Sequence, residues 1–271
     1  MTITRRTALH GSGLTAAGLA TLATTTQASA QAQQGRSRTF VLVHGSWHGG
    51  WCWARVRDIL AAKGHRVYTP TLTGLADRSH LLSTSINMDT HIADIVNLYK
   101  WEDLENTVLV GHSYGGWPIS GAVETIGAQV ASIVFLDAFM PENGEKLMDI
   151  TPEPLRVQLR EAVAKGVAGR PIPPASGFRI VKPEDVAWVQ AKMTEQPVGS
   201  ALQPIVLTGA RDRIAKKAYI RAADYPNPLF DRHLAKCQAD PSWKAIAFKD
   251  CGHDVMVDAP ARLAQTLEEV A

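Results

Sequence analysis

A serine between glycines is the residue of this 271-residue chain whose surroundings most favour covalent chemistry. Residues 111–115 read Gly-His-Ser-Tyr-Gly, directly after the apolar run 107–110 and before a stretch with helical spacing. In a sharp strand-to-helix turn, small flanking residues let neighbouring backbone approach closely, and the serine hydroxyl stands above the end of the sheet. The following helix also directs its positive N-terminal end at the site. Ser113 is therefore the predicted nucleophile.

A serine hydroxyl is a weak nucleophile at neutral pH and needs a neighbouring base. Residues 251–254 read Cys-Gly-His-Asp and follow the last expected strand, so a glycine-containing loop can bring His253 to Ser113. His44 and His48 have the spacing of metal ligands, but no carboxylate or cysteine cluster accompanies them. We interpret that pair as structural and predict His253 as the general base.

A third residue must orient the imidazole and stabilise its cation, and three acids compete for that role. Asp224 follows the expected strand 218–222, and one helix and the final strand separate it from His253. Asp212 follows a glycine turn, but if it were the acid, the expected strand 218–222 would have no role in positioning the catalytic residues. Asp137 ends an apolar run and is interpreted as a loop-capping carboxylate. Order and spacing favour Asp224, with Asp212 and Asp137 as the alternatives.

Acyl transfer also needs donors for the oxyanion that develops on the carbonyl oxygen. Residues 43–50 read Val-His-Gly-Ser-Trp-His-Gly-Gly and link the first apolar strand to the next helix. The glycines allow backbone N–H groups to turn inward. We predict the N–H groups of Ser46 and Tyr114 as the two donors. The alternative, a phosphate-binding loop, lacks the G-x-x-x-x-G-K-[ST] pattern.

The elements that must position these residues alternate along the chain. Short apolar runs suit strands buried on both faces, and segments of helical spacing separate them. This alternation predicts an α/β fold with a mostly parallel, doubly wound sheet. Residues 141–203 interrupt the alternation and predict a small helical cap over the carboxyl ends of the strands. The expected strands are 39–43, 66–69, 107–110, 131–136, 218–222 and 243–248; the expected helices are 53–63, 89–101, 118–126, 154–165, 183–194, 229–238 and 260–270.

The first thirty residues have the features of an export signal. Arg5 and Arg6 form a twin arginine, a weakly apolar stretch follows, and residues 28–30 read Ala-Ser-Ala, a small-x-small cleavage pattern. The apolar stretch is too short to span a bilayer as a mature helix. We predict a cleaved twin-arginine signal over residues 1–30, with a Sec-type signal as the alternative. Residues 31–38 are then a polar linker. We expect the mature chain in the periplasm or outside the cell.

Charge and composition exclude several classes of protein. The chain has 28 Lys and Arg against 26 Asp and Glu, and Arg5 and Arg6 account for the net charge of +2. The remaining body is electrically neutral, so it offers no electrostatic basis for binding nucleic acid or an anionic membrane. With 45% apolar and 20% charged residues, the composition is that of a soluble globular protein.

Taken together, these motifs resemble the α/β-hydrolase superfamily over residues 39–271. The similarity is greatest to the branch of plant methylesterases, the related hydroxynitrile lyases and bacterial esterases. It rests on Phe-Val-Leu-Val-His-Gly-Ser-Trp-His-Gly-Gly-Trp at 40–51, Gly-His-Ser-Tyr-Gly-Gly at 111–116, and the stretches 134–141 and 219–224. The resemblance places the acid after the strand that contains Tyr219 and Ile220, which adds to the case for Asp224. The catalytic residues predict an acyl-enzyme mechanism that needs no metal or organic cofactor, and an apolar pocket would suit a small to medium hydrophobic ester.

Two positions separate the chemistries of that branch. The lyases that it contains carry Thr after the loop histidine and Lys after the catalytic histidine, where this chain has Gly45 and Asp254. A carboxylate repels cyanide, so a hydroxynitrile lyase is the less favoured alternative. Related epoxide hydrolases and dehalogenases use an aspartate nucleophile, which Ser113 contradicts. A non-catalytic ligand-binding member would be expected to have lost one of the three catalytic groups.

The substrate pocket and the cysteines complete the expectations. Cys237 and Cys251 could be bridged in an oxidising compartment, but nothing constrains their geometry, so three free thiols are expected. Aromatic and apolar residues close to the motifs are candidate pocket walls, with core packing as the alternative. These residues are Trp47, Trp51, Phe139, Met140 and, from the cap, Trp188.

Overall fold

The computed structural model describes residues 37–271. The predicted export signal, residues 1–30, and all but the end of the predicted linker, 31–38, lie outside the described residues.

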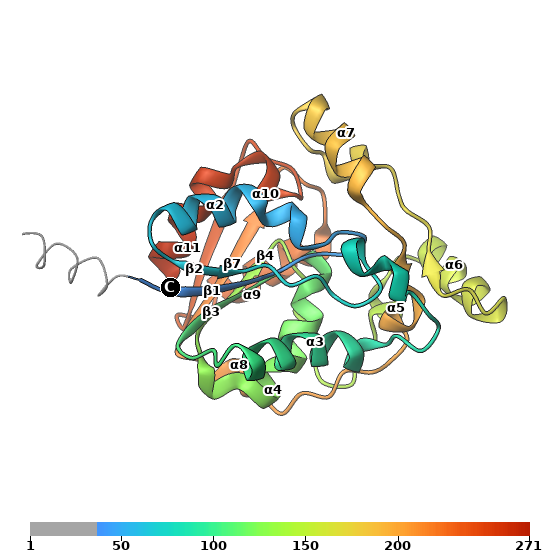
Figure 1. Cartoon of the computed structure of the whole chain (residues 1–271), viewed down its shortest axis with the longest axis horizontal. Helices are drawn as coiled ribbons and strands as arrows, with labels where there is room; N and C mark the ends of the chain where they lie inside the picture. Colours follow the sequence, from blue (N-terminus) through green and yellow to red (C-terminus); the bar gives the residue numbers. More distant parts are fainter. Residues whose placement is uncertain (1–36) are drawn as a thin grey trace, which may run out of the picture. The chain divides into compact units, whose positions relative to one another are not determined.

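Six parallel strands form the central sheet in the order β2-β1-β3-β4-β7-β8 (Figure 1). The middle strands are almost entirely buried, because a parallel sheet is covered on both faces. The predicted parallel, doubly wound sheet is confirmed. Its strands are β1 Thr39–Val43, β2 Arg66–Tyr68, β3 Thr107–His112, β4 Val130–Leu136, β7 Lys216–Ala222 and β8 Trp243–Phe248.

The side chains of β1 point alternately to the two faces of the sheet, and each face is covered by its own hydrophobic core. Successive side chains of a strand point to opposite faces. Phe40 and Leu42 join a cluster with residues of α2 and α11, whereas Val41 and Val43 join a second cluster with residues of α3 and α4. Figure 1 shows the same two layers, with α2, α10 and α11 above the sheet and α3, α4 and α8 below it. The helices are α2 Ala54–Ala62, α3 Met88–Trp101, α4 Gly116–Ile126, α8 Ala210–Arg213, α9 Pro228–Gln238, α10 Val255–Asp258 and α11 Pro260–Val270.

The chain between β4 and β7 contains the helices predicted for the cap. It also contains a two-stranded antiparallel pair, β5 with β6, which the sequence analysis did not anticipate. This pair is attached to the loop after β1, because the Trp47 N–H donates to Gln196 Oε1 at 3.0 Å and the Thr194 N–H donates to the Trp47 carbonyl at 3.0 Å. The elements are α5 Leu147–Ile150, α6 Glu153–Ala164, β5 Gly169–Arg170, α7 Pro183–Lys192 and β6 Gln196–Pro197.

Short 3-10 helices form the remaining turns. They are η1 Gly50–Trp53, η2 Ala76–Leu81, η3 Ser113–Gly115, η4 Gly127–Gln129, η5 Ala175–Phe178 and η6 Val198–Ala201. None of the helices described in residues 37–271 has the length and apolar character needed to cross a membrane.

All three cysteines are buried free thiols, as expected. Burial raises the pKa of Cys237 to about 12 and that of Cys251 to about 11. Both side chains therefore stay protonated at neutral pH and behave as small apolar residues.

Candidate active site

Ser113 occupies a tight turn between β3 and α4. Its φ of 52° lies in the left-handed region that side chains rarely adopt. The flanking glycines make this turn possible: a Cβ on Gly115 would lie 2.8 Å from the His44 carbonyl oxygen, and one on Gly111 would lie 2.7 Å from the Gly115 carbonyl oxygen. The strained turn predicted from the motif is therefore present, and backbone packing on both sides holds it.

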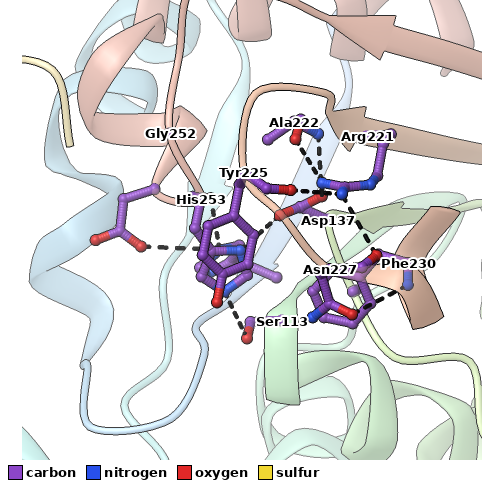
Figure 2. A network of polar contacts seen from close by, with 12 residues as sticks. Ser113, Asp137, Arg221, Ala222, Tyr225, Asn227, Phe230, Gly252 and His253 are labelled. Carbon is purple, nitrogen blue, oxygen red and sulfur yellow. Dashed lines mark hydrogen bonds and ion pairs between the residues drawn. The ribbon is translucent and has the colours of Figure 1, made fainter. Parts of the chain in front are cut away.

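The imidazole of His253 links Ser113 to a buried carboxylate (Figure 2). The Ser113 hydroxyl donates to His253 Nε2 at 2.8 Å, and His253 Nδ1 donates to Asp137 Oδ2 at 2.6 Å. The Tyr225 ring stacks on the imidazole, with the ring centroids 4.5 Å apart. This arrangement can remove the proton from the serine hydroxyl as its oxygen attacks an electrophile.

The predicted position of Asp224 beside His253 is wrong. Asp224 lies exposed in the loop after β7, where its Oδ2 accepts a hydrogen bond from the Asp250 N–H at 2.6 Å. Asp212 is also remote, because its side chain is 66% exposed and faces Arg211. The carboxylate at His253 comes from Asp137, the least favoured of the three acids. Because β4 lies between β3 and β7, the end of either β4 or β7 can deliver an acid to the histidine loop.

A buried arginine holds Asp137 in place. Arg221 Nη1 donates to Asp137 Oδ1 at 2.7 Å, and the Ala222 N–H donates to the same oxygen at 3.0 Å. Arg221 also donates to Asp231 Oδ1 at 2.9 Å and to the Tyr225 carbonyl at 2.6 Å. Burial opposes its charge, but attraction to Asp137 outweighs that effect and raises the pKa of Arg221.

The sequence contains a further signal for this pairing. Arg221 follows the buried run Ala-Tyr-Ile at 218–220 of β7, and a charge in that position requires a buried acid as its partner. Asp137 directly follows a buried strand and is itself fully buried. Searching for the partner of Arg221 would have favoured Asp137 over the exposed Asp224.

A second buried ion pair lies behind the histidine loop. His48 Nε2 donates to Asp254 Oδ2 at 3.0 Å, and His48 Nδ1 donates to the Ser46 carbonyl at 2.7 Å. Since both ring nitrogens face acceptors, the ring is an imidazolium. Burial opposes both charges, but their mutual attraction prevails: it raises the pKa of His48 and lowers that of Asp254 to about 2. The pair ties the loop after β1 to the residue that follows His253.

The other two histidines near the site are neutral. His112 Nε2 donates to the His253 carbonyl at 3.0 Å, and burial together with repulsion from His253 lowers its pKa well below the ordinary value. His44 Nδ1 donates to the Gly45 carbonyl, whereas His44 Nε2 accepts from the Leu72 N–H. Burial lowers the pKa of His44 to about 3. The structural interpretation of His44 and His48 agrees with these contacts, and residues 37–271 contain no cluster of three metal-ligating side chains.

The loop after β1 lies against Ser113. A Cβ on Gly45 would come within 2.9 Å of the Ser113 Cβ. The Ser46 N–H has no acceptor among the described residues, and Ser46 shares a cavity wall with Ser113. Tyr114 lies in the first turn after the strand, where helix N–H groups have no intrahelical partner. Both predicted donors therefore lie beside Ser113.

A cavity of about 460 Å³ opens over these residues. Its walls come from the loops after β1, β3, β4, β7 and β8, and from the segment between β4 and β7. Trp47 and Phe139 line it as proposed, but Met140, Trp51 and Trp188 do not. Trp51 packs between His48 and Trp188 instead. The lining includes Ser46, Ser113, His253, Leu147, Ile150, Leu155, Arg170, Phe178, Tyr225 and Phe230.

Comparison with known proteins agrees with this fold. A family model described as the alpha/beta hydrolase family matches residues 40–266. The carbendazim hydrolyzing esterase of Nocardioides sp. (strain SG-4G) is 38% identical over 240 residues, which is 84% of this chain and 97% of that protein. Methylesterase 1 of Arabidopsis thaliana is 37% identical over 122 residues, 41% of this chain and 43% of that protein. The solved structure of an extracellular alpha/beta-hydrolase from a Paenibacillus species superposes with a TM-score of 0.72 at 23% identity, covering 86% of this chain and 99% of that chain.

Proposed function

The chain belongs to the alpha/beta hydrolase family and is an esterase-type hydrolase, and we propose that it cleaves carboxylic esters through Ser113, His253 and Asp137. The observation that carries this proposal is the unbroken series of hydrogen bonds from the Ser113 hydroxyl through the imidazole to the Asp137 carboxylate. Asp137 replaces Asp224 in the role of the acid.

The first half-reaction forms an acyl-enzyme. Ser113 Oγ attacks the ester carbonyl carbon while His253 Nε2 takes the hydroxyl proton. The electron pair of the carbonyl moves to oxygen, and the Ser46 and Tyr114 N–H groups donate to that oxyanion. When the tetrahedral intermediate collapses, His253 returns the proton to the departing alkoxide, so the products are an alcohol and acylated Ser113.

The second half-reaction repeats these steps with water. His253 removes a proton from water as its oxygen attacks the acyl carbon, and the same proton then returns to Ser113 Oγ. Asp137 holds the imidazole in the tautomer with a proton on Nδ1 and stabilises the imidazolium that forms in each half-reaction. Arg221 is a positioning residue, since it contacts Asp137 and not the reacting atoms.

Local residues favour ester hydrolysis over carbon–carbon cleavage. A lyase that releases cyanide needs a positive group beside the general base, and the residue after His253 is Asp254. That carboxylate is ionised and already bonded to His48. The retention of all three catalytic groups argues against a ligand-binding module without activity.

The substrate is a small molecule, and the cavity suits a partly apolar ester. Leu147, Ile150, Leu155, Phe139 and Phe178 supply the apolar walls. The names of the relatives mention carbendazim hydrolysis and methyl-ester cleavage. A methyl ester of a medium-sized acid is therefore the first class of substrate to test.

The decisive experiment measures burst and steady-state hydrolysis of short-chain 4-nitrophenyl esters by wild-type protein and by Ser113→Ala. We expect turnover that Ser113→Ala abolishes, because no other described side chain bonds to His253 Nε2 as a nucleophile. Mass spectrometry of the quenched burst should find the acyl group on the peptide containing Ser113. Turnover that survives in Ser113→Ala would exclude the mechanism.

Export and domain boundaries belong to the same proposal. Residues 1–30 are proposed as a cleaved twin-arginine signal and 31–38 as a linker, with a periplasmic or secreted mature hydrolase domain over 39–271 and a cap around 141–203. The twin arginine and the Ala-Ser-Ala pattern support this interpretation. Sequencing the N-terminus of exported protein should find Gln31; an intact N-terminus would refute the cleavage.

A further inference from the structure

A second arginine, Arg170, lines the proposed active-site cavity without any partner for its charge. It lies on β5 and is only 3% exposed, and its Nε is buried without a hydrogen-bond acceptor. Among the residues that the structure describes, no carboxylate forms an ion pair with it. Glu195 lies against the neighbouring Gly169 but does not pair with Arg170. Burial lowers the pKa of Arg170 to about 10, so the side chain still carries its charge at neutral pH.

The surroundings hold this guanidinium in one place relative to the reacting residues. Its Cζ lies 4.8 Å from the centroid of the Trp47 ring, a cation–π contact that occupies one face of the planar group. The backbone of Arg170 pairs with Gln196, whose side chain accepts the Trp47 N–H. Since Trp47 directly follows Ser46, Arg170 is fixed to the loop that carries a proposed oxyanion donor.

The cavity wall contains a second unpartnered donor. Trp47 Nε1 is buried without an acceptor, like Arg170 Nε. No aspartate or glutamate lines this cavity, whereas Arg170 and the exposed Arg232 both do. A buried cation without a partner is costly, and folded proteins usually pair it. The Arg170 guanidinium lines the cavity without an acceptor from the described residues, and a ligand in that cavity can supply one.

We propose that Arg170 binds a carboxylate carried by the substrate, so that the preferred substrates are monoesters of dicarboxylic acids. This inference rests on the proposed function of the same cavity. Arg170 would donate to the carboxylate with its planar group, the Trp47 ring would hold that group in place, and the apolar walls would hold the connecting chain.

The test uses monomethyl esters of linear dicarboxylic acids from succinate to suberate. Each is compared with the methyl ester in which a carboxamide replaces the free carboxylate, since the two groups have nearly the same shape and differ in charge. Varying the chain length samples the distance between Ser113 and Arg170. At the best length we expect kcat/KM for the carboxylate ester to exceed that for the amide by ~10-fold or more, as hydrogen bonds to charged groups are the stronger ones.

Arg170→Met should lower kcat/KM for the carboxylate ester by ~10- to 100-fold and bring the ratio of the two esters close to unity. Arg170→Lys should retain part of the preference, because it keeps the charge without the planar donor group. Arg211→Met is the control: Arg211 is also buried and its Nε has no hydrogen-bond acceptor, but it pairs with Asp212, donates to the Pro141 carbonyl and does not line this cavity. That control should leave the ratio unchanged.

The inference and the proposed function fail in different ways. Equal rates for the two esters across the whole series, or an equal loss on both in Arg170→Met, would overturn the inference and leave ester hydrolysis intact. Hydrolysis of neither ester by wild-type protein would refute the proposed function. In that event, calorimetric binding of the monomethyl esters to Ser113→Ala, with and without Arg170→Met, still decides whether Arg170 binds the carboxylate.

Discussion

Two arginines are buried near the cavity, and their surroundings are opposite. Arg221, at the end of β7, is 1% exposed and bonds to Asp137, Asp231 and backbone carbonyls. Arg170, on β5, is 3% exposed, packs on the Trp47 ring and forms no ion pair with any described residue. The first charge is fully compensated by the protein, and the second is not. The comparison teaches that burial alone does not define a role: a paired charge positions other groups, whereas an unpaired one is available to a ligand.

The largest expected effect concerns the acid that Arg221 holds. Asp137→Asn should reduce kcat by ~10⁴-fold, because an amide no longer keeps the proton on His253 Nδ1. Asp224→Asn should leave kcat within about twofold of wild type, since Asp224 lies exposed and bonds only to the Asp250 N–H. Steady-state hydrolysis of one ester by both variants makes the measurement. Loss of activity in Asp224→Asn would instead assign the role of the acid to Asp224, as the sequence predicted.

The next effect contrasts the two arginines directly. Arg221→Met should lower the free energy of unfolding by about 3–5 kcal/mol, because it leaves Asp137 buried without its cationic partner. Arg170→Met should leave that free energy unchanged or raise it, because it removes an uncompensated buried charge. Urea unfolding of both variants tests the contrast. Equal destabilisation would mean that Arg170 is a structural residue.

His48 and Asp254 should make the free energy of unfolding depend on pH, with an effect of intermediate size. The folded-state pKa of Asp254 is lowered to about 2, so its stabilising effect is present above the unfolded-state pKa of 3.8 and is lost as the pH falls towards 2. The folded-state pKa of His48 is raised, so its contribution is complete below pH 6.5 and declines as the pH rises through the folded-state value. The pair should therefore contribute most between about pH 4 and 6.5.

The double variant His48→Gln/Asp254→Asn provides the measurement. Its stability deficit relative to wild type should be greatest near pH 5 and should shrink on acidification below pH 4, as followed by urea unfolding. A deficit that stays constant from pH 3 to 7 would show that the two residues do not act as an ion pair.

The smallest effect on substrate preference should come from replacing Arg232, which lines the same cavity as Arg170 but is exposed. Water screens its charge, so Arg232→Gln should change the ratio of carboxylate to amide ester hydrolysis by less than ~3-fold. Measuring this ratio of ester hydrolysis in Arg232→Gln and in Arg170→Met compares the effect of an exposed cation with that of a buried one. A larger effect of Arg232→Gln would move the carboxylate site towards the cavity mouth.

Features that depend on neighbouring residues could be predicted from the amino-acid sequence. Apolar runs alternating with helical spacing specified the parallel sheet, because burial on both faces requires continuous apolar strands. The glycines around Ser113 specified its turn, and the loop at 251–254 indicated His253, since both signals are local. For the same reason Ser46 and Tyr114 could be placed beside the nucleophile.

Which acid contacts His253, and which arginine has no ion-pair partner, could not be predicted from local sequence. Asp137 and Asp224 both follow strands that end at the same edge of the sheet, and spacing along the chain does not reveal which side chain turns inward. Asp137 is chosen because Arg221 and the Ala222 N–H reach it across the sheet. Arg170 has no distinguishing motif, and its isolation arises from the packing of β5 against the loop after β1. Local sequence sets backbone geometry, but the pairing of buried charges depends on residues far apart in the chain.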